Sequence, residues 1–476
     1  MTNYKTILQD PVFDLIAQTA QELDQKTFVV GGFVRDVLLK RPSKDIDIVT
    51  LGKGIDFARL VAQKLGDNVG VTEYKNFGTA LIKYGDYQIE FVGARKESYR
   101  RNSRNPIVEE GSLKDDQDRR DFTINSMAFS LNSADFGSLI DPHGGILSIE
   151  YKEIKTILDP GKTYSDDPLR MMRAIRFASQ LNFTIESDSY QAISKNASRI
   201  EIVSKERIID ELNKIILTKT PSRGLNMLHE TGILGIIFPE MVALSGVEVI
   251  NGKAHKDNFL HTLQVLDNIS ENTDDLWLRW SAILHDIAKP PTKRFDHKTG
   301  WTFHGHEDLG AKMVPEIFRK LKLPLDQKMK YVQKMVRLHL RPIALVKETV
   351  TDSAIRRLLF EGGDDVDDLM ILCQADITTQ NKDKQKRYAD NFKKVKKKLK
   401  EVEEKDHLKS WQPPVTGQMI MEAFNLEPCK EVGLIKNTIR EAILEGEITN
   451  NHEEAFKLMI SEGRKLGLNP VDEALK

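Results

Sequence analysis

Short apolar and alternating runs dominate the first 150 residues and predict β-strands. The run TFVV (27–30) ends at Gly31–Gly32, and DIDIVT (45–50) alternates polar and apolar positions with the period of a half-buried strand. Further strand candidates, bounded by turn residues, are NVGVTEY (68–74), TALIKYG (79–85) and YQIEFVG (87–93). Because helical segments lie between these runs, the pattern predicts a small α/β or α+β domain.

The pattern changes to a helical period from about residue 165. The segment DDPLRMMRAIRFASQL (166–181) begins with aspartates, which suit the positive end of a helix dipole. Its apolar positions then recur at helical spacing: Leu169, Met172, Ile175 and Ala178. Residues 203–217 and 221–237 predict two more helices. No convincing strand follows, so we expect the rest of the chain to be helical.

Composition narrows the class of protein. The 476 residues suggest two to four domains at roughly 100–200 residues each. The 70 Lys and Arg balance 71 Asp and Glu, which excludes a uniformly basic nucleic-acid coat but allows a local basic surface. Two cysteines exclude a disulfide framework and favour a reducing cytoplasm. Because the chain shows neither a signal peptide nor an apolar run of about 18 residues, we expect no membrane partner.

The strongest chemical signal lies at the first two strand candidates. A glycine pair between a strand and a helix, Gly31–Gly32, allows a phosphate to approach the backbone, and the helix N-terminus adds unpaired N–H groups. Arg35, in the first turn of that helix, is placed to hold a triphosphate. Asp45 and Asp47 are two residues apart on a strand, so their carboxylates share one face.

A pair of carboxylates on one face suits Mg²⁺, which prefers carboxylates together with substrate phosphates, and such a pair holds both ions of a two-metal site. Glu90, in the strand candidate YQIEFVG, is a candidate for a third carboxylate. A single Gly-Gly is usually a turn and a single Asp-x-Asp is usually solvated. The combination at this spacing is far more specific.

The run VVGGFVRD…KDIDIV closely resembles the class II tRNA nucleotidyltransferases, which comprise CCA-adding enzymes and bacterial poly(A) polymerases of the polymerase-β-like superfamily. The resemblance covers about residues 28–212, in the family's motif order. The further segments that carry it are ARKESYRRNSRNPIVEEGSL, RRDFTINSMA (119–128), DPHGG (141–145), DDPLRMMR (166–173) and SKERIIDEL (204–212).

The resemblance implies a role for each matching residue. Asp45 and Asp47 correspond to the catalytic, metal-binding carboxylates, and Glu90 to a third catalytic acidic residue. Gly31, Gly32 and Arg35 correspond to triphosphate contacts. Ribose and triphosphate recognition is implied for Arg120, Asp121 and Asn125. Asp167 and Arg170 correspond to the pair that reads the base of CTP or ATP. This chain has Asp166–Asp167 where the family commonly has Glu-Asp, and we expect selection of C and A to survive because the first acid is the less direct one.

The arginines of the 166–181 segment have two interpretations. Arg170, Arg173 and Arg176 lie within about a 120° arc of an ideal helix. This arrangement suits a solvated helix face or a groove for a triphosphate and an RNA backbone. The upstream motifs favour the groove, so all three are candidate nucleotide-binding residues.

A second constellation combines imidazoles and carboxylates, a ligand set suited to Mn, Fe, Ni, Zn or Mg. Its members are His261, His285, Asp286, His306, His339 and Asp376. The segments around them resemble HD-domain phosphohydrolases, which implies four core ligands in His261, His285, Asp286 and Asp376 and a second metal at His306 and His339. The alternative is a degenerate scaffold that binds RNA. The implied substrates are 2′,3′-cyclic phosphates or 2′-nucleotides at RNA ends.

A basic run between Lys382 and Lys400 has a net charge of +8 over 19 residues, from ten Lys and Arg and two Asp. It is either part of a track for a tRNA backbone or a solvated helix. The candidate RNA contacts are Lys393, Lys394, Lys396 and Lys397. The segment after Pro413–Pro414 resembles the family's tRNA-contacting C-terminal region.

The expected fold class is therefore α+β, with a polymerase-β-like nucleotidyltransferase head (1–152), an all-α neck (153–245), an HD-type helical body (246–400) and a helical tail (401–476). The implied reaction is template-independent addition of CCA to tRNA, with CTP, ATP and Mg²⁺. An A-adding enzyme remains open, whereas an intact 95–118 segment argues against CC addition alone. A poly(A) polymerase would carry a Gly-Arg-Arg-Phe type segment where this chain has FGTALIKYG (77–85). An alternative of another class is an HD phosphohydrolase whose head only binds RNA.

Overall fold

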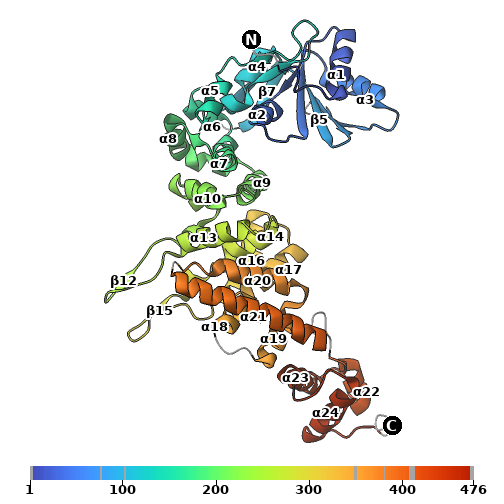
Figure 1. The fold of residues 1–476 in the computed structure, drawn as a ribbon, viewed down its shortest axis with the longest axis vertical. Coiled ribbons are helices and arrows are strands. Elements are labelled where there is room, and N and C mark those ends of the chain that lie inside the picture. Colours follow the sequence, from blue (N-terminus) through green and yellow to red (C-terminus); the bar gives the residue numbers. More distant parts are fainter. Residues whose placement is uncertain are drawn as a thin grey trace. The chain divides into compact units, whose positions relative to one another are not determined.

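A computed structural model describes residues 4–75, 78–100, 103–347, 351–379, 381–406 and 413–471. Phe77, the first residue of the FGTALIKYG segment, and residues 101–102 of the 95–118 segment lie outside these ranges. The chain divides into two compact units, Met1–Val242 and Ala243–Lys476, each described by itself below (Figure 1). Among the described residues, no helix combines the length and the apolar content that crossing a membrane requires.

The first unit is built on a seven-stranded sheet of order β3-β4-β5-β2-β1-β8-β9. Neighbouring strands are antiparallel except for β2 and β5, which are parallel. The strands are β1 (Thr27–Val30), β2 (Asp45–Thr50), β3 (Val71–Tyr74), β4 (Thr79–Tyr84), β5 (Tyr87–Gly93), β8 (Ala128–Ser130) and β9 (Leu139–Ile140). The mixed sheet and the helical segments around it confirm the α+β class expected from the sequence.

Alternation in β2 determines what each face of the sheet carries. Ile46 and Ile48 are fully buried in the core that the sheet forms with α1 (Pro11–Glu22) and α3 (Gly54–Leu65). Phe57 of α3 contacts Phe91 of β5 in that core at a ring-centroid distance of 5.5 Å. Because successive side chains of a strand point to opposite faces, Asp45 and Asp47 lie on the face away from these helices.

The head continues through a hairpin and short helices. The hairpin pairs β6 (Arg95–Arg100) with β7 (Ser103–Glu110), two strands that the sequence analysis did not predict. A short helix begins at Gly32 directly after β1, as the glycine pair predicted. The helices of this part are α2 (Gly32–Leu38), α4 (Leu113–Asp118), η2 (Thr123–Asn125) and α5 (Gly145–Glu150).

The rest of the first unit is almost entirely helical. Helix α7 (Leu169–Leu181), predicted from its apolar period, packs on α9 (Lys205–Ile216) and α10 (Pro221–Glu230). The helix predicted for residues 221–237 is broken, because Gly232 adopts a φ of +80° between α10 and α11 (Ile233–Ile237). The other elements are β10 (Glu153–Ile154), α6 (Pro160–Asp166), β11 (Thr184–Ile185), α8 (Ser187–Asn196), η3 (Ala197–Ile202) and α12 (Pro239–Val242).

The second unit is a helical body with two short β-hairpins. The expectation of no strands after residue 165 was wrong here, because β12 (Val249–Ile250) pairs with β13 (Lys253–Ala254), and β14 (Arg294–Asp296) with β15 (Gly300–Thr302). Runs of two or three residues are too short to show a periodic pattern. The helices are α13 (Asn258–Ser270), α14 (Leu276–Leu284), α15 (Lys289–Thr292), α16 (His306–Leu321), α17 (Gln327–Leu338), α18 (Leu340–Lys347), α19 (Asp352–Gly362), η4 (Gly363–Asp365) and α20 (Val366–Asp376).

The second unit ends with a long basic helix and a small helical cluster. Helix α21 (Lys382–Asp406) packs against α18 and α19 through Phe392, Val395 and Leu399, all buried. The last helices share a separate core that includes Ile420, Ile435 and Met459. They are α22 (Gly417–Phe424), α23 (Lys430–Glu445) and α24 (His452–Lys465).

Candidate nucleotide site and metal centre

Three predicted carboxylates meet at the parallel strands β2 and β5. In the register of this pair Asp47 lies opposite Glu90, and Asp45 lies opposite Gln88, so the three carboxylates share the exposed face of the sheet. Asp45, Asp47 and Glu90 line a cleft with a volume of about 510 Å³. Arg95, from the start of β6, lines the same cleft.

The electrostatics of Asp47 fit a divalent cation at this position. Burial raises the pKa of Asp47, the guanidinium of Arg120 opposes that rise, and the carboxylates of Glu90 and Asp45 add to it. The pKa of Asp47 rises because burial and the two neighbouring carboxylates outweigh Arg120. The cluster therefore needs more positive charge than Arg120 supplies. Oxygen ligands of this kind are those that Mg²⁺ prefers.

Gly31 brings the turn after β1 close to this cluster. Its φ of +77° is a conformation that side chains rarely adopt, and an added Cβ would lie 2.7 Å from Arg120 Nη1 and 3.1 Å from Asp47 Oδ2. A glycine is therefore required for the guanidinium to lie between the turn and the carboxylate. Gly32 follows at the first position of α2.

Asp116, which the sequence analysis missed, holds Arg120 in this place. Its side chain is completely buried, accepts a 3.0 Å hydrogen bond from Arg120 Nε, and also pairs with the guanidinium of Arg119. Burial raises the pKa of Asp116, but Arg120 and Arg119 outweigh it and leave the pKa below its ordinary value. The sequence signal for this contact is the spacing, because Asp116 lies three residues before Arg119 and four before Arg120 in a helical segment.

A buried network joins α2, η2 and α7. Arg35 donates to both carboxylate oxygens of Asp36 at 3.0 and 2.7 Å and to Asn125 Oδ1 at 2.8 Å. Asn125 Nδ2 donates to Asp121 Oδ1 at 3.0 Å, and Arg173 Nε donates to Asp121 Oδ2 at 2.7 Å. These contacts tie the predicted triphosphate and ribose residues to one another and to α7.

The charge of Asp121 is strongly favoured in this network. Burial raises its pKa, but the guanidinium of Arg173 and the hydrogen bond from Asn125 outweigh burial and lower the pKa to about 2. Arg173 is stabilised in turn, and the carboxylate raises its pKa despite burial. Phe177 of α7, also missed from the sequence, has the guanidinium carbons of Arg35, Arg173 and Arg176 within 4.2 to 5.4 Å of its ring centroid.

The predicted base-reading residues lie at the start of α7. Asp167 Oδ1 accepts from the backbone N–H of Leu169 at 3.3 Å, as a residue at a helix N-terminus does. Arg170 Nη2 donates to the backbone carbonyl of Arg119 at 2.6 Å, so this arginine is held next to the Arg119–Arg120 pair. Arg176 Nε lies 3.2 Å from Glu211 Oε2, and Arg176 is not among the residues that line the carboxylate cleft.

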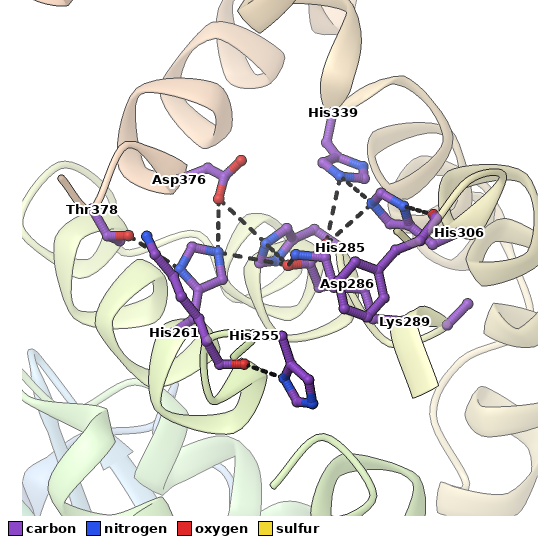
Figure 2. Close-up of polar contacts among 12 residues, drawn as sticks. His255, His261, His285, Asp286, Lys289, His306, His339, Asp376 and Thr378 are labelled. Atoms are coloured by element: carbon purple, nitrogen blue, oxygen red, sulfur yellow. Dashed lines mark hydrogen bonds and ion pairs between the residues drawn. The ribbon is translucent and has the colours of Figure 1, made fainter. Parts of the chain in front are cut away.

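In the second unit, six predicted ligands converge at the ends of five helices (Figure 2). His261 is on α13, His285 and Asp286 follow α14, His306 begins α16, His339 follows α17, and Asp376 ends α20. Asp286 is central. Its Oδ2 lies 3.2 Å from His285 Nε2 and 3.6 Å from His261 Nε2, and its Oδ1 lies 3.2 Å from His306 Nε2 and 3.9 Å from His339 Nε2. Asp376 Oδ1 lies 2.9 Å from His261 Nε2.

These side chains form two candidate metal groups that share Asp286. One is His261, His285 and Asp286, and the other is Asp286, His306 and His339, each with ligand atoms within 4.8 Å of one another. Only His261 is partly exposed, whereas the other members are buried. The first group contains three of the four predicted core ligands, and the second joins the predicted pair, His306 and His339, to Asp286; Asp376, the fourth predicted core ligand, belongs to neither group.

Three imidazoles are oriented by the same local contact. The Nδ1 atoms of His285, His306 and His339 each lie 2.7 Å from the backbone carbonyl three residues earlier. A protonated Nδ1 that donates to a carbonyl leaves Nε2 as the metal-binding nitrogen, and all three Nε2 atoms are directed at Asp286 (Figure 2).

The charges of this cluster also fit a cation. Burial lowers the pKa of His285, but Asp286 and Asp376 outweigh burial and raise it to about 10. Burial opposes ionisation of Asp286, yet His285, His306 and Lys289 hold its pKa well below the ordinary value. Despite this proximity, buried His285 Nε2 and Asp286 Oδ2 have no hydrogen bond of proper geometry among the described residues. His285 Nε2 is therefore a buried nitrogen that a bound metal would satisfy, whereas Asp286 Oδ2 is already paired with Lys289 Nζ at 2.6 Å.

Two residues near the cluster were missed in the sequence. Lys289 Nζ lies 2.6 Å from Asp286 Oδ2, and Thr378 Oγ1 lies 3.2 Å from His261 Nδ1. A lysine three residues after a helix-terminal aspartate and a threonine two residues after Asp376 were visible in the sequence, but only the fold shows which carboxylate and which imidazole they contact. The predicted RNA contacts Lys393, Lys394, Lys396 and Lys397 are exposed on α21.

Family models match three parts of the chain. Residues 27–155 match the poly A polymerase head domain, residues 182–244 match a probable RNA and SrmB-binding site of polymerase A, and residues 258–380 match the HD domain. The first match lies within the first unit, and the second extends two residues beyond its end. The third lies in the second unit, where the imidazole cluster is found.

Curated relatives include two kinds of tRNA-modifying protein. The chain is 28% identical over 436 residues to an A-adding tRNA nucleotidyltransferase of Deinococcus radiodurans, covering 89% of this chain and 93% of that protein. It is 37% identical over 220 residues to a CCA-adding enzyme of a Geobacillus species, covering 46% of this chain and 52% of the relative. Two other A-adding relatives are matched over only 24% and 27% of their own length.

A solved structure shows the same fold. The CCA-adding enzyme of Bacillus stearothermophilus in complex with CTP has a TM-score of 0.69 to this chain at 22% sequence identity, covering 97% of this chain and 98% of the other. The chain therefore shares the fold of that enzyme.

Proposed function

Because the chain belongs to the family of tRNA nucleotidyltransferases and poly(A) polymerases that carry a C-terminal HD domain, we propose that it adds CMP and AMP to the 3′ end of tRNA without a nucleic-acid template. The observation that carries this proposal is the meeting of Asp45, Asp47 and Glu90 on one face of β2 and β5, with the Arg120 guanidinium beside Asp47.

In this reaction the tRNA 3′-hydroxyl attacks the α-phosphate of the incoming nucleotide, and pyrophosphate leaves. Mg²⁺ held by Asp45 and Asp47 supplies activation of the hydroxyl and neutralisation of charge on the phosphates. The positive φ of Gly31 brings the turn and the Arg120 guanidinium together, so backbone N–H groups and a cation converge where a triphosphate would lie. Asp116 holds that guanidinium in place.

Base selection falls to Asp167 and Arg170. A guanidinium offers five donors in a rigid fork, and the Arg119 carbonyl uses one of those of Arg170. Together with a carboxylate acceptor, the fork matches an amino group beside an unprotonated ring nitrogen on the Watson–Crick edge. C and A share this pattern, whereas the corresponding ring nitrogen of G and U carries a proton. Arg170→Ala should relax the choice between nucleotides more than it weakens triphosphate binding, with Arg170→Lys as the variant that keeps the charge but loses the fork. Unchanged selection in both variants would refute the base-reading role.

We favour addition of the complete CCA sequence over addition of A alone. The Asp167–Arg170 pair suits both bases, and the 95–118 segment, which in this family helps the switch from C to A, is present and begins at the carboxylate cleft with Arg95. Addition of A alone is the second candidate, because the relative that is matched over nearly its whole length is an A-adding protein.

Incorporation on three tRNA transcripts distinguishes these activities. The transcripts end before CCA, after C and after CC. Each receives Mg²⁺, CTP and ATP, and one of the two nucleotides is labelled. Completion of all three to CCA establishes the proposed activity. Extension of the CC-ending transcript alone makes the chain an A-adding protein, and a long adenosine ladder makes it a poly(A) polymerase. Asp45→Ala serves as the inactive control.

We also propose that the HD domain hydrolyses phosphate esters at RNA ends with bound metal. The support is the pair of ligand groups that share Asp286, together with His285 Nε2, a buried ring nitrogen that has no hydrogen bond among the described residues. The ligand chemistry admits Ni, Mn, Fe, Zn or Mg. Asp286→Ala should abolish hydrolysis of a 2′,3′-cyclic phosphate and leave CCA addition intact, whereas Asp45→Ala should do the reverse. If Asp286→Ala and Asp45→Ala abolish the same activity, the two-site assignment is wrong.

A further inference from the structure

A cleft with a volume of about 520 Å³ opens beside the imidazole cluster. It is formed by β13, β15, the start of α13 and Lys289, and His261 belongs both to its lining and to the metal ligands. A single nucleotide fits a space of this size, which lies within the usual range for small-molecule sites. No part of the nucleotidyltransferase proposal uses this cleft.

The lining combines positive charge with aromatic surface. Lys253, His255, Lys256 and Lys289 contribute basic groups, and none of the described lining residues is acidic. Lys256 is exposed, while Lys289 is held at the inner end by its 2.6 Å contact with Asp286. A phosphate is the ligand group that such a set of cations attracts.

The aromatic part is fixed by hydrogen bonds between the two hairpins. Trp301 Nε1 donates to the carbonyl of Lys253 at 3.0 Å, and Lys253 Nζ donates back to the carbonyls of His297 and Lys298 at 3.2 and 2.8 Å. The His255 ring stands edge-on to Trp301 at a centroid distance of 5.2 Å. The indole is therefore held in place before any ligand arrives, and a base stacks on such a ring without sequence preference.

We propose that this cleft binds the terminal nucleotide of the phosphate ester that the HD centre hydrolyses, with the base on Trp301 and the phosphate toward Lys289 and His261. The inference rests on the proposed HD activity and names its substrate class, a nucleotide carrying a 2′- or 2′,3′-cyclic phosphate. For the cyclic ester, water attacks phosphorus, one of the two ring P–O bonds breaks, and the released ribose oxygen takes a proton. The product is a phosphomonoester.

Two variants of the full-length chain test the base and phosphate contacts separately. Lys256→Gln removes an exposed charge that no metal ligand contacts, and Lys256→Arg restores it. Trp301→Leu removes the stacking surface. The matched control is Lys436→Gln, an exposed lysine on α23 outside the cleft. The kinetic readout is KM against kcat for 2′,3′-cyclic AMP and for glycerol 2-phosphate, which has no aromatic ring to stack.

We expect Trp301→Leu to raise KM for the cyclic nucleotide about tenfold, as loss of one stacked base does, and to change kcat for that substrate and KM for glycerol 2-phosphate much less. Lys256→Gln should raise KM about three- to tenfold, because one charge-assisted contact is lost, and Lys256→Arg should recover it. Unchanged KM for the cyclic nucleotide in both variants overturns the proposal. A decamer RNA ending in a 2′,3′-cyclic phosphate supports the proposal if its KM rises in the same way. If only the free nucleotide is affected, the cleft does not receive RNA ends and this part is overturned.

Direct binding separates the cleft from the activity. Affinity for adenosine 2′-monophosphate is measured by calorimetry on the wild-type chain, on Trp301→Leu and on Lys436→Gln. If no ester is hydrolysed but Trp301→Leu alone weakens binding about tenfold, the cleft stands and the HD activity fails. If hydrolysis occurs and binding is equal in all three proteins, the HD activity stands and the cleft assignment fails.

Discussion

The carboxylate of Asp121 offers the most quantitative test of the first unit. It is buried, accepts from Asn125 and Arg173, and so connects η2 to the helix that carries Arg170. Asp121→Asn keeps the size of the side chain and one acceptor oxygen but removes the charge. We expect this variant to lose stability at neutral pH and to position Arg170 less well.

The magnitude follows from the proton affinity of the carboxylate. Its pKa falls from an ordinary 3.8 to about 2 in the folded chain. Each tenfold change in a proton-binding constant corresponds to about 1.4 kcal/mol, so the charged form contributes roughly 2–3 kcal/mol to the unfolding free energy. Because the folded pKa is the lower one, this contribution is fully present above pH 4 and is lost as the pH falls toward 2.

Urea unfolding of the full-length chain, followed by far-UV circular dichroism, measures the difference between wild type and Asp121→Asn at several pH values. The unfolding transition of the first unit should be destabilised by about 2–3 kcal/mol at pH 7, and the difference should shrink between pH 4 and pH 2. The control is Asp210→Asn, which removes an exposed i,i+4 pair with Lys214 and should cost less than about 1 kcal/mol.

Two results would refute this reasoning. One is a cost of Asp121→Asn no larger than that of Asp210→Asn. The other is a cost at pH 7 that persists unchanged at pH 2.5, because a contribution that does not titrate cannot come from the charge. Hydrogen exchange over residues 169–181 then shows whether the loss is local to α7, where the model of a tied helix predicts faster exchange in Asp121→Asn.

Three further predictions concern other parts of the chain. Gly31→Ala should cost about 1–3 kcal/mol of unfolding free energy and raise KM for CTP and ATP, because the added Cβ would meet Arg120 and Gly31 has a positive φ. The control is Gly235→Ala, whose added Cβ would have no neighbour within 4 Å. Equal effects of the two substitutions would contradict this prediction. In equilibrium dialysis with Ni²⁺, His306→Ala should lose one bound ion, and Asp286→Ala should lose both because both ligand groups contain Asp286. Equal loss in the two variants would argue against two sites. Replacing the four exposed lysines of α21 with glutamine should weaken tRNA binding and flatten its dependence on log salt by up to about 3, whereas an unchanged slope would leave α21 a solvated helix. These lysines are Lys393, Lys394, Lys396 and Lys397.

The strands that the sequence predicted most clearly are those in which the alternation of polar and apolar residues runs through the whole strand. The strands of DIDIVT and YQIEFVG alternate over six or seven residues, and both appear as β2 and β5. The hairpin of β6 and β7 was missed because RKESYR and SRNPIVEE are rich in charge and include a proline, so neither shows a buried face in the sequence. Its pairing is a contact between segments, which a single strand's pattern does not encode.

The candidate site residues likewise divide into those that a sequence pattern predicted and those that it did not. The metal-binding candidates could be predicted because their residue types and spacing are chemically unusual, and the structure brings Asp45, Asp47 and Glu90 together as the spacing suggested. Asp116 was missed because an aspartate in a charged run such as DDQDRR (115–120) is ordinarily solvated. Only its complete burial beneath two arginines distinguishes it. Burial depends on which distant segments cover a residue, and no local pattern reports that.

The two candidate metal sites differ in the way that the backbone fixes their ligands. In the head, carboxylates on adjacent strands share a face by register alone, so their side chains remain free to adjust as a nucleotide enters and pyrophosphate leaves. In the HD domain, three imidazoles are each locked by a carbonyl three residues earlier, and they converge on one buried carboxylate. Metal that arrives and leaves with a substrate suits the first arrangement, and a resident metal suits the second. The proposed division of labour, with Mg²⁺ at the head and a more tightly held ion at the HD centre, follows from this difference in rigidity.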